Sequence, residues 1–234
     1  MKQKQSGFTL VEIAIVLVII GLLLGGILKG QELINSARVR SLADKAIGAQ
    51  AAYYGFVDRY RAIPGDMTAD AATNAIGVTV SSGGDANGQL DNSVGTEWTE
   101  PNALWEQLSK AGFITGNYIG GDTMPNSDNN VAPLNPFNQP IVVGNTADYM
   151  GESTTSVRLN IVLGRSMPVD VAREVDVKMD DGQPLTGSMR VAIDDGAVFG
   201  TVGQSDGQTV CQIQSSNTYN VEGNSQDCNL VYIF

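Results

Sequence analysis

The sequence predicts an α+β protein in which one long N-terminal helix packs on an antiparallel β-sheet. An apolar run lies near the N-terminus, and a proline-free segment with helical spacing follows it. From residue 131 onward, short apolar runs separated by turn residues indicate strands. About two hundred residues follow the apolar run, which is enough for one domain with its own core.

Composition narrows the classes of function. The 14 Lys and Arg residues against 25 Asp and Glu residues give a formal net charge of −11. Phosphate binding needs clustered basic side chains, so we expect no direct binding of nucleic acid. The chain has no histidine, no Gly-x-Ser-x-Gly elbow and no phosphate-binding loop, which argues against an enzyme. Two cysteines without histidine also argue against a transition-metal site, and calcium is the only cofactor candidate.

The first predicted element is a helix of membrane-spanning length over residues 8–28. Such a helix is about 32 Å long and matches a bilayer core of about 30 Å. One acid, Glu12, interrupts the apolar run. A carboxylate in hydrocarbon is costly unless it finds a partner, so we expect Glu12 to meet another chain in the bilayer or in an assembly built there. Lys2 and Lys4 precede the run and hold the N-terminus on the cytoplasmic side.

The residues at the start of this run resemble a known processing signal. After a basic leader they read Ser6-Gly7-Phe8-Thr9-Leu10-Val11-Glu12-Ile13. The combination resembles the class III signal of type IV pilins and type II secretion pseudopilins. The resemblance implies that a prepilin peptidase cuts after Gly7 and methylates the new N-terminus at Phe8. It also implies that Glu12 pairs with the terminal amine of Phe8 in a neighbouring subunit as subunits stack, each buried charge satisfying the other.

The same resemblance implies a pilin-like fold and a division of the chain into three parts. Residues 1–7 are the leader peptide, residues 8–30 are the transmembrane and filament-core helix, and residues 31–234 are the periplasmic or extracellular globular domain, which includes the second half of the long helix. The expected location is the inner membrane, as a single-pass protein with a cytoplasmic N-terminus, and later a periplasmic or extracellular filament. The expected partners are other pilin-like subunits, in homo- or hetero-oligomers, together with the prepilin peptidase and the inner-membrane assembly platform. Before assembly, membrane lipid is also an expected partner.

One position departs from the pattern of many major pilins. They carry a proline at the mature position that Lys29 occupies here. Gly21 and Gly25 form either a close-packing face or a point where the helix bends. The lysine in place of proline at position 29 argues against a typical major subunit and is compatible with a minor subunit.

Two helices are expected before the strands. The long helix continues to about Tyr60, since residues 31–58 contain no proline and place apolar and small residues at near-helical spacing. The Pro64-Gly65 pair ends it. Residues 77–94, rich in Gly, Ser, Asn and Asp, are expected to be mostly loop. A short amphipathic helix over residues 101–112 then buries Leu104, Trp105, Leu108 and Ala111, with Gly112 as its C-cap.

The remaining chain is expected to form an antiparallel sheet on the second half of the long helix. The predicted strands are residues 139–144, 156–163, 188–193, 197–199 and 230–234. A short helix begun by Pro168 is expected over residues 167–176.

Cys211 and Cys228 lie close together near the C-terminus. In a chain that leaves the cytosol, a disulfide between them is the simplest interpretation, with two buried free thiols as the alternative. Such a bond contributes about 3 kcal/mol in the chain-entropy model.

Some loops are rich in side-chain oxygens, the ligand atoms that bind calcium, so we consider a calcium site. Asp176, Asp180 and Asp181 are the first-choice ligands, and a further such loop spans residues 85–91. Some secretion pseudopilins bind calcium in a C-terminal loop, but no matching motif is present here. Solvated Asp-Gly turns are the favoured interpretation.

The predicted function is structural. The chain is interpreted as a major or minor pilin of a type IV pilus-like filament, because many pilins close a C-terminal disulfide loop. A pseudopilin of a type II secretion system is the alternative. A monomeric membrane-anchored adhesin is a third hypothesis, from a different class.

Overall fold

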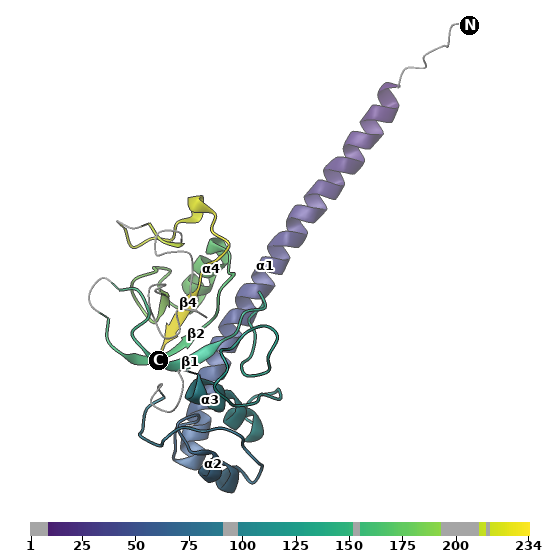
Figure 1. Ribbon diagram of the computed structural model, residues 1–234. Coiled ribbons are helices and arrows are strands. Elements are labelled where there is room, and N and C mark those ends of the chain that lie inside the picture. Colours follow the sequence, from purple (N-terminus) through teal and green to yellow (C-terminus); the bar gives the residue numbers. More distant parts are fainter. Residues whose placement is uncertain (1–8, 91–97, 152–154, 193–210, 214–215) are drawn as a thin grey trace. The chain divides into compact units, whose positions relative to one another are not determined.

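The computed structural model describes residues 9–90, 98–151, 155–192, 211–213 and 216–234. The chain forms two compact units, Met1–Arg38 and Val39–Phe234, each of which is described by itself. The elements comprise a long N-terminal helix, shorter helices and an antiparallel four-stranded sheet (Figure 1). The predicted α+β fold class is therefore confirmed.

Helix α1 spans Leu10–Tyr60 and confirms the expected long helix. In the second unit its buried residues recur every three or four positions, since that spacing returns side chains to one face. They are Val39, Leu42, Ala43, Ala46, Ala49, Ala52, Tyr53 and Phe56. The helix ends where Arg61 adopts a left-handed conformation with φ of 55°, three positions before Pro64.

Helix α2, Ala69–Ile76, was not predicted. The hydroxyl of Thr68 accepts a hydrogen bond from the backbone N–H of Ala71, at 3.3 Å, and Gly77 closes the other end with φ of 81°. An N-cap threonine and a C-terminal glycine were therefore visible in the sequence as helix boundaries.

Helix α3, Thr99–Lys110, confirms the predicted short amphipathic helix. Its C-terminus is a Schellman motif, in which Gly112 donates to the carbonyl of Ser109 and Phe113 to that of Leu108. Gly112 has φ of 79°, which explains why glycine stands there. Trp98 and Trp105 are both buried.

The sheet contains β1 (Val142–Thr146), β2 (Arg158–Val162), β3 (Met189–Val191) and β4 (Leu230–Ile233) in the order β1-β2-β4-β3, with every neighbouring pair antiparallel. The C-terminal strand thus lies between β2 and β3. The four strands overlap predicted ones, while the strand expected over residues 197–199 lies outside the described residues. Helix α4, Val169–Met179, follows Pro168 and extends further than expected.

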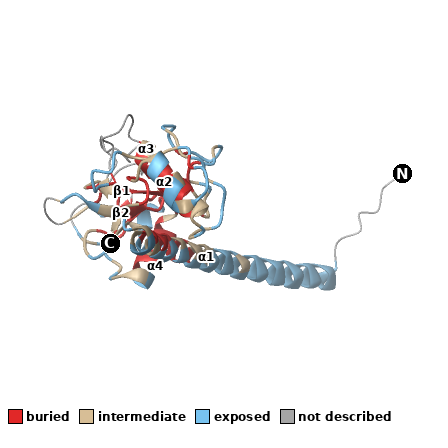
Figure 2. Cartoon of the chain, turned by 90° about the horizontal axis from the view of Figure 1, so that it is seen from below, coloured by how far each residue is buried: buried red, intermediate tan, exposed pale blue. Residues whose placement is uncertain are grey.

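Both faces of the sheet carry buried side chains. One cluster joins α1, α3 and α4 to the sheet through residues such as Phe56, Trp105 and Ile161. A smaller cluster on the other side contains Trp98 and Tyr149. Figure 2 shows the buried residues concentrated in the second unit, whereas α1 is exposed over residues 10–29. The second unit therefore has a core of its own.

Candidate functional site

The first turn of α1 is held by a reciprocal capping box between Thr9 and Glu12. Glu12 Oε2 accepts hydrogen bonds from the backbone N–H of Thr9 at 2.8 Å and from its hydroxyl at 2.7 Å. The backbone N–H of Glu12 donates in return to Thr9 Oγ1 at 3.3 Å. The Thr-x-x-Glu spacing that signals such a box was present in the sequence, but the interpretation of Glu12 as an assembly residue overlooked it. Gly7 and Phe8 lie outside the described residues.

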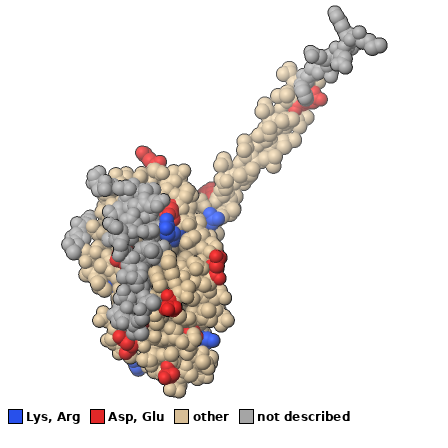
Figure 3. Space-filling model, viewed as in Figure 1, with Lys and Arg blue, Asp and Glu red and all other residues tan. Residues whose placement is uncertain are grey.

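An uncharged apolar surface follows Glu12 along the helix. Large apolar side chains are exposed from Leu10 to Leu28, and the most apolar 18 residues of α1 have a mean hydropathy of 2.8. In Figure 3 this stretch is tan, with charged side chains only towards its two ends. Lys29 and Glu32 form an exposed ion pair of 2.7 Å just after it. By length and composition the segment fits a membrane anchor.

Comparison with known proteins identifies a family match at the N-terminus of the chain. Residues 2–28 match the family described as the prokaryotic N-terminal methylation motif. The chain carries the type IV pilin and pseudopilin signature. Proteins with this signature are structural subunits that are processed by prepilin peptidase and assemble with other pilin-like subunits. No curated protein and no solved structure matches the chain significantly.

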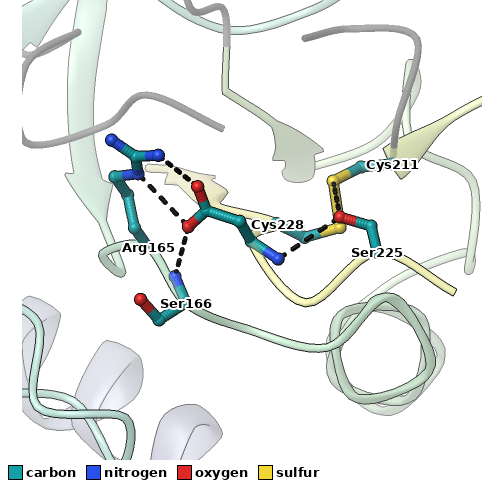
Figure 4. Close-up of polar contacts among 6 residues, drawn as sticks. Arg165, Ser166, Cys211, Ser225 and Cys228 are labelled. Carbon is teal, nitrogen blue, oxygen red and sulfur yellow. Dashed lines mark hydrogen bonds and ion pairs between the residues drawn. A yellow bond between two sulfur atoms is a disulfide. The ribbon is translucent and has the colours of Figure 1, made fainter. Parts of the chain in front are cut away.

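The pilin-like chain closes a disulfide between Cys211 and Cys228, as predicted. Backbone hydrogen bonds in both directions join Cys228 to Met167, at 2.8 and 3.2 Å. The neighbouring Asp227 forms an ion pair with Arg165 and accepts a hydrogen bond from the backbone N–H of Ser166 at 2.9 Å (Figure 4). The segment before α4 thus anchors one end of the disulfide loop.

The three predicted calcium ligands lie close together in space. Oxygens of Asp176, Asp180 and Asp181 lie within 4.8 Å of one another. Asp176 is buried and accepts hydrogen bonds from the Tyr219 hydroxyl at 2.7 Å and the Gly182 N–H at 3.0 Å. Burial, reinforced by the two neighbouring carboxylates, raises the pKa of Asp176 to about 6 against these hydrogen bonds.

Asp180 and Asp181 already serve as acceptors for the loop that follows α4. Asp180 accepts hydrogen bonds from the backbone N–H groups of Ser188 and Met189. Asp181 accepts from the Gln183 N–H at 2.9 Å and the Thr186 hydroxyl at 2.6 Å. The arrangement therefore fits two roles for the trio, a loop clamp and an oxygen-rich metal site.

A second acidic group includes residues that sequence reasoning missed. Asp66, Asp85 and Glu100 bring carboxylate oxygens within 4.8 Å of one another, and Asp66 and Glu100 are buried. Asp66 accepts hydrogen bonds from the backbone N–H groups of Asn87 and Gly88, at 2.9 and 3.1 Å. The predicted oxygen-rich loop thus wraps around Asp66, a distant partner with no spacing signal in the sequence.

Proposed function

We propose that this chain is a major or minor subunit of a type IV pilus-like filament that assembles from the inner membrane. The apolar surface of α1 from Leu10 to Leu28, directly after the methylation motif, supports this proposal. Fully burying a Leu, Ile or Val side chain contributes roughly 1.5–3 kcal/mol. Such a surface first takes lipid as its partner and then the equivalent helices of neighbouring subunits. The Cys211–Cys228 loop supports the pilus over the other assemblies.

The capping box supports a specific role for Glu12 in assembly. Both hydrogen bonds that the Glu12 carboxylate accepts use Oε2, and within the described residues Oε1 accepts no hydrogen bond. Cleavage after Gly7 would create a charged amine at Phe8 in every subunit. Glu12 then holds its own helix start through Oε2 while Oε1 accepts the amine of a neighbouring Phe8. A paired carboxylate and amine are each far less costly in an apolar filament core than either charge alone.

The substitution Glu12→Gln separates capping from charge pairing. Gln also serves in a capping box, so the helix start is retained while the charge is removed. We expect Glu12→Gln and Glu12→Ala to reduce sheared surface filaments at least about tenfold, counted by electron microscopy, with normal amounts of processed chain in the membrane. Glu32→Ala on the same helix is the matched control and should assemble normally. Normal filaments in Glu12→Gln would exclude the charge-pairing mechanism.

A pseudopilin of a type II secretion system is the second candidate, supported by the acidic trio at the C-terminal end of α4 and in the loop that follows it. The assemblies are distinguished by deleting the gene and measuring two outputs. Loss of surface filaments with normal protein secretion supports the pilus. Loss of secretion with no change in surface filaments supports the pseudopilus. If neither output changes and Glu12→Gln has no effect on surface filaments, the monomeric adhesin becomes the better explanation.

A further inference from the structure

Two loops of the second unit share a short sequence and the same local arrangement. One contains Asn87-Gly88-Gln89 and the other contains Asp181-Gly182-Gln183. In each loop Oδ1 of the first side chain accepts a hydrogen bond from the backbone N–H of the glutamine, at 2.8 Å for Asn87 and 2.9 Å for Asp181. Both glycines have positive φ angles, of 91° and 76°. Within the described residues, these are the two places where Asn or Asp directly precedes Gly.

In each loop a buried aspartate from outside the shared sequence binds the glycine N–H. Gly88 donates to Asp66 Oδ2 at 3.1 Å, and Gly182 donates to Asp176 Oδ1 at 3.0 Å. Asp66 is 4% exposed, and Asp176 on α4 is fully buried. The two aspartates stand 22 and 6 positions before their glycines, so the same contact is reached along two different chain paths. The turn itself therefore does not supply the carboxylate, and the tertiary fold does.

The glycine nitrogen is the atom that makes an Asn-Gly or Asp-Gly pair chemically labile. After losing its proton, this nitrogen attacks the side-chain carbonyl carbon of the preceding residue, and the new bond closes a succinimide ring. Ammonia leaves from asparagine, and water leaves from aspartic acid. A water molecule then opens the ring and produces an aspartyl or an isoaspartyl residue. Glycine favours the reaction because it has no Cβ to obstruct the attack. Both loops therefore contain a potential modification site.

A carboxylate bound to the glycine N–H opposes the first step of this reaction. Loss of the proton would place a negative nitrogen beside a negative oxygen and would also remove a charge-assisted hydrogen bond. Reaction therefore requires the loop to open first, so that the glycine nitrogen leaves the carboxylate. Asn87, Gly88 and Asp181 are exposed to solvent, so exclusion of water from these residues does not account for protection.

We propose that Asp66 and Asp176 are protective residues that keep Asn87–Gly88 and Asp181–Gly182, respectively, from forming succinimides. Asp66 has the stronger hold, because its Oδ1 also accepts the N–H of Asn87 at 2.9 Å. An isoaspartyl residue carries one more methylene group in the backbone than an aspartyl residue. Its formation would break the turn that each buried carboxylate organises. The inference does not depend on the filament role.

The test follows modification of the purified full chain in detergent micelles, at mildly alkaline pH, in water labelled with heavy oxygen. The label enters when water opens the ring, so peptide mass spectrometry locates each site that has reacted. We expect Asn87 and Asp181 to react at least about tenfold more slowly in the folded wild type than in the same chain unfolded in guanidinium chloride. Equal rates in the folded and unfolded wild type would refute protection.

Asp66→Asn and Asp176→Asn assign the protection to the two carboxylates, because each substitution removes the charge and keeps the size of the side chain. In the folded chain, Asp66→Asn should accelerate the reaction of Asn87 at least about tenfold and leave that of Asp181 unchanged. Asp176→Asn should accelerate the reaction of Asp181 and leave that of Asn87 unchanged. Each variant is thus the control for the other.

Asp70→Asn, which neutralises an exposed acid on α2, is the matched control for charge and should react like the wild type at both sites. In guanidinium chloride all the chains should react alike, since the carboxylates then hold no loop. A wild-type rate at Asn87 in folded Asp66→Asn would contradict the assignment. Acceleration at both sites in both variants would also overturn it, because general loosening of the fold would then control the rates.

Discussion

The hydroxyl of Tyr219, inside the segment closed by the disulfide, donates a 2.7 Å hydrogen bond to the buried carboxylate of Asp176 on α4. Burial of both groups raises the pKa of Tyr219 as well as that of Asp176. The disulfide loop is thus tied to α4 through a carboxylate that is expensive to ionise in its folded position.

The burial of Asp176 predicts that the stability of the folded chain changes with pH. The pKa of Asp176 rises from 3.8 to about 6 on folding, so the folded state binds its proton more tightly than the unfolded state. The resulting stabilisation is fully present below pH 3.8 and is lost as the pH rises through about 6. Between pH 7 and pH 4, we expect the free energy of unfolding of the wild type to rise by on the order of 2 kcal/mol relative to that of Asp176→Asn. Urea unfolding of both chains across this range measures the difference, and a constant difference would contradict the assignment.

Removing the disulfide is expected to lower the free energy of unfolding by more than the pH effect at Asp176, and by the same amount at every pH. Cys211 and Cys228 are separated by 17 positions and are both fully buried. The double substitution Cys211→Ala with Cys228→Ala should cost about 3 kcal/mol, because the unfolded chain regains the freedom that the loop removed. Urea unfolding measures this loss, and wild type treated with dithiothreitol should approach the variant. A double variant as stable as the oxidised wild type would show that the bond contributes little.

The calcium hypothesis for Asp176, Asp180 and Asp181 predicts a melting temperature that rises with calcium. Binding requires the ionised form of Asp176, so the rise should be larger at pH 7.5 than at pH 5. Asp181→Asn should abolish the rise, while Glu174→Gln, an exposed acid on the same helix, should preserve it. If the melting temperature is the same with calcium, magnesium and chelator, the trio acts only as a loop clamp.

Replacing Glu106 on α3 is expected to destabilise the second unit. This buried carboxylate accepts hydrogen bonds from the backbone N–H groups of Ser81, Ser82 and Gly120, at 2.9, 3.2 and 3.0 Å. Glu106→Ala leaves these donors without their acceptor, at a cost of about 1–3 kcal/mol for each one that water does not reach. In thermal unfolding, Glu106→Ala should lower the melting temperature by much more than Lys110→Ala, a substitution at the end of the same helix. Equal melting temperatures for the two variants would mean that water replaces the carboxylate.

Local patterns in the sequence were sufficient for many of these elements. The 3.6-residue period is a property of neighbouring residues, so α1 and its end near Tyr60 were predicted correctly. Pro168 and Gly112 mark helix boundaries for equally local reasons. The disulfide followed from the presence of only two cysteines. Helix α2 was missed although Thr68 and Gly77 delimit it, because its short apolar pattern lies within a loop-rich segment.

By itself, the sequence determined the methylation motif, the apolar helix that follows it and the types of most later elements, because each depends on residues within a few positions of one another. Only the tertiary structure decided which distant residues meet. The strand order β1-β2-β4-β3 places the C-terminal strand between β2 and β3, and the folding of the second unit brings Asp66 beside Glu100. These neighbours are set by long-range burial and strand pairing, which leave no fixed spacing in the sequence.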